Sequence, residues 1–409
     1  MQKTMTPIND YSKFCCPNPS CKFYGMKEND NIKHRSWTGK NKDIERLRCR
    51  ECSLEFSSRK GTLIERSSLS ASTVARILKC FRWGLHDEAI ADVCEVDQDT
   101  VVNIRTRAAI RAQIHHDQEV KEIRDPAAQA DELYVKISQK SSCWIAASIL
   151  TQCLLIVSLA VGARDQSMAD KLIAETKLRC CWLLAIFTDG WRPYLSSIVR
   201  CFGRLTRPRR KHVRGPNPKP RLKVEDILYA QVVKMRDFAY KLVGVQARSR
   251  IGSMKECLNC ISLFKLGKKI HTAHIERFWA SFRCYQAFAR RRSRCLVKTE
   301  QSCSERTWVW VSLYNWVITH SSLTISGIRR TPAMAAGLIN RPLSYEEYVL
   351  MPVFDTGNEL KVKITNELKR MNDPEILIAA SRTKIACERY SIWEKPPDIK
   401  DEYEEKIAC

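Results

Sequence analysis

The strongest constraint on the fold is an uncharged run of 21 residues from Cys143 to Ala163, "CWIAASILTQCLLIVSLAVGA". A helix of this length is long enough to span a bilayer. The same residues can form two buried strands, "CWIAASIL" and "LLIVSLAVG", joined by Thr151 and Gln152. The strand-forming residues, the central polar break and the absence of a flanking positive anchor favour the strands. The run therefore predicts a buried β-hairpin, and we expect no membrane partner.

Hydrophobic periodicity changes along the chain. Residues 1–60 are rich in cysteines and loops, whereas residues 68–123 carry apolar residues at helical spacing. From residue 130 onward a strand meander precedes alternating strands and helices, which predicts a mixed α/β sheet. Besides the hairpin we expect strands at 130–138, 183–189 and 238–247, and helices at 166–179, 194–202, 254–266, 272–291 and 304–318. The last fifty residues are charged and weakly periodic, which predicts a marginal helix or a disordered tail.

The chain is strongly basic, since 69 lysines and arginines against 45 aspartates and glutamates give a formal net charge of +24. Such a surplus favours a polyanionic partner, either nucleic acid or an anionic membrane surface. Two runs concentrate the charge, "RPRRKHVRGPNPKPRLK" at 207–223 and "ARRRSRCLVK" at 289–298. The first is typical of an exposed loop, and solubilising surface charge is the alternative for both.

Nineteen cysteines suggest a secreted disulfide framework, but two features argue against one. The opening "MQKTMTPINDYSKF" lacks the apolar segment of a signal peptide. Most of the cysteines also stand singly within apolar segments, as in reduced cytosolic proteins. We therefore expect a cytoplasmic protein.

One group of cysteines differs from these single cysteines because its members form two close pairs. Cys16 and Cys21 form a close pair in "CCPNPSC", Cys49 and Cys52 form a second in "LRCRECSLEF", and 27 residues separate the pairs. Four thiolates from two such pairs suit a tetrahedral zinc ion, which would stabilise a small fold that has little core. Cys15 is an alternative ligand to Cys16.

The stretch "HDEAIADVCEVDQDTVVNIRTRA" at 86–108 is typical of a helix-turn-helix. A short helix, a tight turn and a second helix opened by Asp97 or Asp99 fit the motif. Glu95 stands in the turn where glycine is usual, and an ordinary helical hairpin is the alternative. Residue types that contact phosphates and base edges would face outward from the second helix, namely Asn103, Arg105 and Arg107.

Three acids stand on separate predicted elements. Asp131 opens the strand "DELYVKIS", Asp189 ends the strand "LAIFTD", and Glu276 lies in the predicted helix "HTAHIERFWASFR". If they converge at one sheet edge, the carboxylates raise each other's pKa unless divalent cations lie between them. Oxygen ligands suit Mg²⁺ or Mn²⁺, and two such ions about 3.5–4 Å apart promote phosphodiester chemistry. A strand-end cap or a solvated charge is the alternative for each acid alone.

Two further patterns are weaker. Cys257 and Cys260 lie in a helical pattern without a second pair nearby, which favours core packing over metal binding. His271 and His274 could join Glu276 in a zinc hydrolase site, but the sequence around them has no metalloprotease pattern. Surface histidines are the alternative.

The motifs also occur in a characteristic order. First come "CPNPSCKFYG" and "LRCRECSLEFSSRKGT", then "DELYVKI", "VGARDQSMADKLI", "FTDGWRPYL" and "YAQVVKMR", and finally "HTAHIERFWASFR", "SLYNWVITHSSL" and "RTPAMAAGL". In this order the chain resembles bacterial insertion-sequence transposases of the DDE type, in particular the insertion-sequence-one-like group. The matching segments extend from about residue 14 to residue 350.

The resemblance implies a domain order. It assigns a zinc ribbon to residues 1–65 and an all-α helix-turn-helix to residues 66–124. It assigns a ribonuclease-H-like (DDE integrase-type) catalytic domain, a mixed sheet with flanking helices, to residues 125–355. A charged tail of unknown role occupies residues 356–409.

The resemblance also assigns residues. The catalytic, metal-binding carboxylates would be Asp131, Asp189 and Glu276. Basic residues after the glutamate would hold phosphates, and a family histidine lies near the active site. These positions match Arg277, Arg283 and His320. From the basic run that follows, we expect the DNA path to be lined by Arg290, Arg291 and Arg292.

Three positions depart from the usual family pattern. His271 replaces an asparagine, Phe278-Trp279 replaces leucine-asparagine, and Thr319 replaces the proline before the matched histidine. None of these departures removes a predicted metal ligand.

Together these features predict a DNA transposase that binds the terminal inverted repeats of an insertion sequence. It would cut the DNA at a site with Mg²⁺ or Mn²⁺ and join the freed 3′-hydroxyl to target DNA, with Zn²⁺ as a structural ion. Its partners would be double-stranded DNA and further copies of the chain, in a homodimer or larger assembly at the bacterial nucleoid. The alternatives are a catalytically decayed DNA-binding protein or repressor, and a ribonuclease-H-like nuclease.

Overall fold

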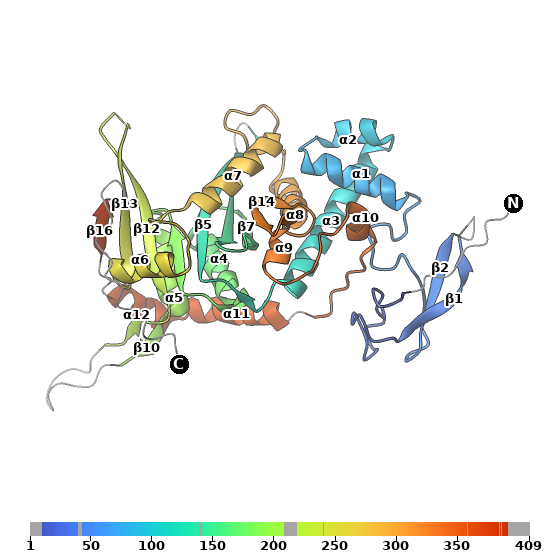
Figure 1. Cartoon of the computed structure of the whole chain (residues 1–409), viewed down its shortest axis with the longest axis horizontal. Coiled ribbons are helices and arrows are strands. Elements are labelled where there is room, and N and C mark those ends of the chain that lie inside the picture. Colours follow the sequence, from blue (N-terminus) through green and yellow to red (C-terminus); the bar gives the residue numbers. More distant parts are fainter. Residues whose placement is uncertain are drawn as a thin grey trace.

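The computed structural model describes residues 10–39, 43–138, 141–207, 219–239, 241–357, 359–383, 385 and 387–391. Along the chain, a small antiparallel sheet precedes a group of helices, and a large mixed α/β region follows (Figure 1). The α/β region consists of a mixed central sheet with flanking helices, as the sequence predicts at the level of fold class.

The N-terminal sheet is antiparallel, in the order β1 (Ile32–Thr38), β2 (Ile44–Cys49) and β3 (Glu55–Ser57). Its core is small, because only a few apolar side chains pack with the buried cysteines beneath the strands. A core of this size supports a stable fold only with an additional cross-link such as a bound metal.

Three helices follow, α1 (Ala71–Arg82), α2 (Asp87–Cys94) and α3 (Gln98–Glu119). The Asp97 side chain caps α3 by accepting a hydrogen bond from the backbone N–H of Asp99. Glu95, between α2 and α3, adopts the left-handed conformation that glycine favours, with φ of 55°. The predicted short helix, tight turn and second helix are therefore present, and the turn forms without glycine.

Seven strands form the central sheet in the order β16-β13-β12-β9-β5-β6-β7. They are β5 (Ala127–Lys136), β6 (Ser142–Leu150), β7 (Ile156–Gly162), β9 (Ala185–Thr188), β12 (Leu228–Arg236), β13 (Leu242–Ile251) and β16 (Glu388–Ser391). The first three form an antiparallel meander, β9 runs parallel to β5, and β12 runs parallel to β9. The last two pair antiparallel, β13 with β12 and β16 with β13. The first strand, β5, therefore lies inside the sheet.

The uncharged run forms the antiparallel pair β6 and β7, which confirms the predicted hairpin. Most of its residues are buried, since helices cover the sheet on both sides. None of the helices in the described part of the chain combines the length and the apolar character needed to cross a membrane.

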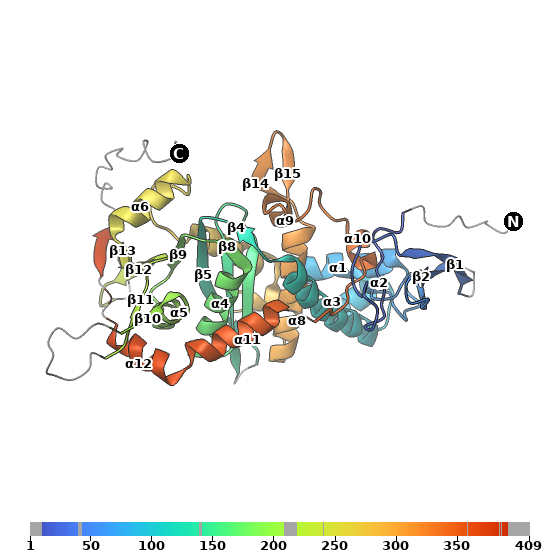
Figure 2. The same cartoon turned by 90° about the horizontal axis from the view of Figure 1, so that it is seen from below.

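Helices pack on both faces of the sheet, and Figure 2 shows α4, α5, α11 and α12 on the side opposite α6. The first group consists of α4 (Gln166–Arg179), α5 (Arg192–Phe202), α11 (Glu359–Met371) and α12 (Pro374–Arg382). The other face holds α6 (Met254–Leu263), α7 (Ala273–Tyr285) and α8 (Glu300–Trp316). Both faces of the sheet are thus covered around β6, β7 and β9, which explains why these strands carry no charged residue.

The weak periodicity after residue 356 predicts a marginal helix or a disordered tail, and this is wrong for residues 359–382. They form α11 and α12, and Met371 and Ile376 join the core between these helices, α4 and α5. Glu367 of α11 also pairs with Lys177 of α4, with 3.0 Å between Oε1 and Nζ. The segment therefore belongs to the α/β region.

Three other expectations need adjustment. The strand expected at 238–247 is β13, which begins four residues later because Phe238 lies exposed in the turn after β12. No predicted strand corresponds to β12. The helix expected at 272–291 ends at Tyr285 and is followed by a short 3₁₀ helix, η1 (Ala287–Ala289).

The remaining elements are short. They are β4 (Ile123–Arg124), β8 (Cys180–Trp182), β10 (Arg204–Thr206), β11 (Arg221–Lys223), β14 (His320–Ile325), β15 (Ile328–Arg330), α9 (Pro332–Ala335) and α10 (Tyr345–Leu350). Strand β10 directly precedes the basic run at 207–223 and β11 forms the last three residues of the run, of which residues 208–218 lie outside the described residues.

Candidate functional site

The three predicted acids line one cavity of about 500 Å³ in the α/β region. Asp131 lies in the middle of β5, which begins at Ala127, so the prediction that it opens the strand is wrong, whereas Asp189 directly follows β9. Ala130 is opposite Thr188 in the parallel pairing of these strands, so the next residue on each strand, an aspartate, lies beside the other. Glu276 reaches the cavity from the first turn of α7. The structure thus brings together acids that lie up to 145 residues apart in the sequence.

A fourth acid, Glu132, was not predicted and forms a tight cluster with Asp131 and Asp189, from which the Glu276 carboxylate stands apart. Carboxylate oxygens of Asp131, Glu132 and Asp189 all lie within 4.8 Å of one another. Glu132 accepts hydrogen bonds from the Tyr194 hydroxyl at 2.9 Å and from Nε of Arg164 at 2.8 Å. Simple strand alternation sends neighbouring side chains to opposite faces, and the only sequence signal for Glu132 was its position next to Asp131.

The cluster is electrostatically unfavourable as it stands. Burial, together with the negative charges of Glu132 and Asp189, raises the pKa of Asp131 to about 7. Burial also raises the pKa of Asp189 and of Glu132. Closely spaced carboxylates behave in this way when no cation lies between them. Their oxygen-only chemistry fits Mg²⁺ or Mn²⁺, so these residues could hold a divalent ion.

Glu276 lies at the rim of the cavity and is more exposed than the other acids. Its Oε1 is 3.1 Å from Nζ of Lys234 and accepts a hydrogen bond from Thr272 Oγ1 at 3.3 Å. The N-terminus of its helix is tied to β5 by the buried Gln129, whose Oε1 accepts hydrogen bonds from the backbone N–H groups of His274 and Ile275 at 2.9 and 3.2 Å. Gln129 thereby fixes Glu276 relative to Asp131.

The four predicted zinc ligands also converge. The Sγ atoms of Cys16, Cys21, Cys49 and Cys52 all lie within 4.8 Å of one another. The Cys16–Cys52 pair is 3.5 Å apart and the Cys21–Cys49 pair 4.0 Å. Four thiolates around zinc, each about 2.3 Å from the ion, are separated by about 3.8 Å, so the arrangement fits a zinc ion. Cys15 is buried but is not part of the cluster.

The surroundings of the cluster favour thiolate at some positions. Burial opposes ionisation of Cys52, but hydrogen bonds from Leu54, Asn18 and the neighbouring thiols outweigh it and lower the pKa of Cys52 to about 7. The side-chain amide of Asn31 donates a hydrogen bond to Cys49 Sγ at 3.4 Å. Such donors stabilise the charged form that binds metal.

The helix-turn-helix prediction is wrong in part, because Arg105 does not face outward. Arg105 is only 6% exposed, and its guanidinium group pairs with Asp87 of α2 and with Glu305 of α8, 2.9 Å away. Arg107 is half-buried, and its guanidinium donates hydrogen bonds to the backbone carbonyls of Thr62 and Glu65. These contacts arise because α3 packs against α8.

Asn103 is exposed, as predicted. It is therefore the one residue of the predicted three whose side chain remains available to a partner.

Replacing Arg105 with alanine is expected to lower the free energy of unfolding by about 3–5 kcal/mol, because it leaves the buried Glu305 without its cationic partner, whereas Asp87 keeps its ion pair with Arg306. Asn103→Ala on the exposed side of the same helix should change it by less than about 0.5 kcal/mol. Urea denaturation of the full chain measures both. Unchanged stability in Arg105→Ala, together with weakened DNA binding, would assign Arg105 to DNA instead.

Four of the predicted basic residues line a second cavity, of about 540 Å³, together with Glu132 of the acidic cluster. Lys136, Tyr134, Trp144 and Phe288 also line it, so aromatic rings accompany the cations. Burial and the neighbouring charge of Arg291 lower the pKa of Arg283, and Asp131 opposes this shift. The cationic members from the predicted set are Arg283, Arg290, Arg291 and Arg292.

Two predicted residues stand apart. Arg277 is exposed on α7 and lines neither of the two cavities. His320 begins β14 and packs against Tyr314 of α8, with ring centroids 4.4 Å apart. The structure does not place His320 among the residues that line the acidic cavity.

His271, Cys257 and Cys260 have structural roles. His271 lies 2.9 Å from the Leu266 carbonyl through Nε2, and its Nδ1 accepts a hydrogen bond from the Ala273 N–H. Both ring nitrogens are therefore occupied, which argues against the zinc hydrolase alternative. Cys257 and Cys260 lie in the core beneath α6, as the packing interpretation predicts.

Comparisons with known proteins do not identify the chain: no protein-family model matches it, and no curated protein matches it.

Proposed function

We propose that the chain is a DNA transposase of the DDE type. The observation that carries this proposal is the meeting of Asp131, Asp189 and Glu276, predicted from three separate sequence motifs, around one cavity. Carboxylates gathered in this way at the side of a basic cavity suit phosphodiester chemistry on a polyanion. The meander β5–β7, followed by strands parallel to β5, agrees with the ribonuclease-H-like domain that the sequence resemblance implies.

In this proposal the carboxylates, Arg164 and Gln129 have distinct roles. When bound, divalent ions on the carboxylates would activate the attacking hydroxyl and stabilise the leaving oxygen. Arg164 lies between the Trp144 and Trp191 rings, 4.6 and 4.8 Å from their centroids, and from there it orients Glu132. Gln129 positions Glu276 by holding the N-terminus of α7.

The remaining parts of the chain would recognise the DNA. The N-terminal sheet, as a zinc ribbon, and helices α1–α3 would bind the terminal repeats. The second cavity, which Arg283 lines and where its charge interacts with that of Asp131, would hold the phosphates next to the reacting bond. Since two element ends must be joined, the proposal includes a homodimer or larger assembly on DNA.

Replacing Arg290, Arg291 and Arg292 together with alanine is expected to weaken DNA binding and flatten its salt dependence. Removal of each phosphate interaction should reduce the slope of log K against log salt by about 0.9. The preference for terminal repeats over random DNA should not change, because phosphate interactions carry no sequence information. Fluorescence anisotropy at several salt concentrations measures both quantities, with Arg329→Ala in the β14–β15 hairpin as the control. An unchanged slope would remove these arginines from the DNA path.

Strand joining tests the proposed function. Pre-cut terminal-repeat oligonucleotides are incubated with the purified protein, Mn²⁺ and a target plasmid, using ends that carry either a 3′-hydroxyl or a 3′-deoxy terminus. A transposase joins only the 3′-hydroxyl ends and only with metal. Salt-sensitive binding of the ends without metal-dependent products would indicate a decayed copy acting as a repressor. Cleavage without joining would indicate a nuclease, and either result would overturn the proposal.

A further inference from the structure

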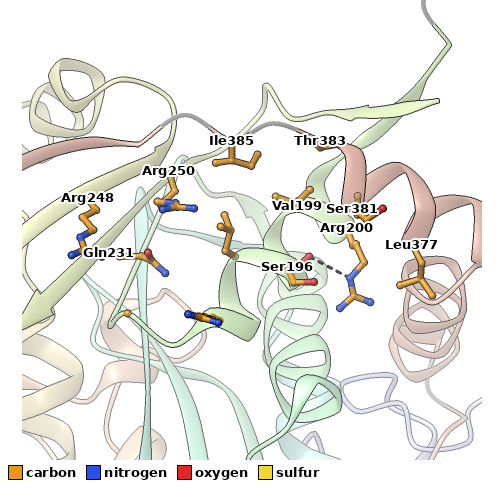
Figure 3. Close-up of a pocket in the computed structure, with 14 residues that line it drawn as sticks. Ser196, Val199, Arg200, Gln231, Arg248, Arg250, Leu377, Ser381, Thr383 and Ile385 are labelled. Atoms are coloured by element: carbon orange, nitrogen blue, oxygen red, sulfur yellow. Dashed lines mark hydrogen bonds between the residues drawn. The ribbon is translucent and has the colours of Figure 1, made fainter. Parts of the chain in front are cut away.

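A third cavity, of about 550 Å³, adjoins the acidic one and is distinct from the basic cavity beside Glu132. Gly190 and Arg192, which closely follow Asp189, line both the third cavity and the acidic one. Figure 3 shows Gln231, Arg248 and Arg250 on the strands at one side, with Leu377 and Ser381 on α12 across from them. The C-terminal segment thus forms a wall of a cavity that continues from the candidate active site.

The cavity is positively charged, and none of the described residues that line it is acidic. Among the described residues, no carboxylate forms an ion pair with Arg192, Arg248 or Arg250. Arg200, which also lines the cavity, differs because it is buried and paired with Asp170 at 2.5 Å. Nε of Arg250 is buried and has no hydrogen-bond partner. Nε of Arg248 donates a hydrogen bond to the Gln246 side-chain carbonyl at 3.0 Å, so it has a neutral partner. Guanidinium groups that face one cavity without a carboxylate partner are typical of an anion-binding site.

The other residues that line the cavity could contact apolar and polar parts of a ligand in addition to its anionic group. Apolar side chains from α5, α12 and the segment after it face the same space, and hydroxyl groups accompany them. The apolar residues are Leu195, Val199, Leu377, Ala380 and Ile385, and the hydroxyl residues are Ser196, Ser381 and Thr383. An apolar wall opposite cations can take a sugar or base on one side and a phosphate on the other.

We propose that this cavity binds a nucleotide of the DNA strand that passes the acidic cluster on the Asp189 side. This inference rests on the proposed function for the identity of the polyanion. Arg192, Arg248 and Arg250 hold its phosphate, and α12 contacts the nucleoside. The cavity lies next to Asp189, whereas the cavity of Arg290–Arg292 lies next to Glu132, so the two basic cavities adjoin different members of the acidic cluster. A DNA strand that occupies both basic cavities therefore passes the acidic cluster, which lies between the two cavities.

The double variant Arg248→Glu/Arg250→Glu tests the inference. Its affinity for a 30-nucleotide DNA, measured by fluorescence anisotropy, should fall by at least about tenfold, with a shallower salt dependence. The control Arg329→Glu/Lys363→Glu has the same change in charge on exposed residues of β15 and α11 and should retain affinity to within about threefold. An equal loss of DNA affinity in both variants would show that the effect comes from net charge alone, and this would overturn the proposed site.

Crosslinking provides a second measurement that does not depend on a variant. DNA with 5-iodouracil beside the cleaved phosphate, irradiated with the native protein, should crosslink to peptides from α5 or residues 374–383. Crosslinks confined to other regions would contradict the proposal. A free mononucleotide that loses affinity in the double variant while DNA affinity is unchanged would make the cavity a small-molecule site. The native protein could fail to join strands while the double variant still binds DNA more weakly than the native protein. This combination would support the site and reject the transposase proposal.

Discussion

Asp189→Asn is expected to lower the rate of metal-dependent strand joining by at least about 1,000-fold, because it removes one carboxylate from a site whose chemistry depends on its charge. Asparagine has nearly the same shape, and its Oδ1 can still accept the hydrogen bond from the Trp191 N–H that Asp189 accepts at 2.9 Å. The fold should therefore persist. Affinity for DNA should stay within about threefold of the native value, since the phosphate contacts come from other residues.

The same variant has a signature that does not depend on activity. In the absence of divalent ions the thermal midpoint should rise, because the neutral amide in place of the Asp189 carboxylate relieves the repulsion among buried acids. Adding Mn²⁺ should then stabilise the native protein more than the variant. Glu346→Gln, a neutralised exposed acid on α10, is the matched control and should resemble the native protein in both assays. Joining by Asp189→Asn at the native rate would exclude Asp189 from the site.

Cys49→Ser is expected to remove bound zinc and unfold the N-terminal sheet. The core there is too small to be stable without a metal, and loss of one of four thiolates weakens the tetrahedral site severely. The zinc content of the purified protein, measured by inductively coupled plasma mass spectrometry, should fall from about one ion per chain to near zero. Limited proteolysis should then cleave preferentially within residues 10–65.

Cys15→Ser is the matched control, since Cys15 is buried nearby but lies outside the cluster. It should retain the zinc ion, whereas loss of zinc on this substitution would restore Cys15 as a ligand. A native protein that is free of zinc and yet resists proteolysis in its first 65 residues would contradict a structural metal there.

Local periodicity accounts for the parts of the fold that the sequence predicted well. The helix expected at 166–179 coincides with α4, and the two halves of the uncharged run form β6 and β7. Each of these patterns depends on residues within one element. Asp189 follows the end of β9, as its sequence position predicted, but Asp131 lies in the middle of β5, so its place beside Asp189 depends on the parallel pairing of β5 with β9.

Long-range packing explains the errors. The spacing of apolar residues in α3 does not show that Arg105 meets Glu305, which is 200 residues away in the sequence, so an arginine that resembles a DNA contact is part of a buried ion pair. Likewise, α11 has too few apolar residues for its sequence to predict a helix, and these residues become part of a core only through contact with α4 and α5. Glu132 was not predicted because its position depends on hydrogen bonds from Arg164 and Tyr194, which lie 32 and 62 residues away in the sequence.

The central claim is that the clustered carboxylates hold the divalent ions of a phosphoryl-transfer site, and direct measurement of Mn²⁺ binding tests it. Electron paramagnetic resonance follows free Mn²⁺ as it is titrated into the native protein and into Asp131→Asn, the variant that neutralises the acid at the centre of the cluster. We predict saturable binding by the native protein and binding at least about tenfold weaker in the variant. Equal Mn²⁺ affinity in the two proteins would contradict the claim.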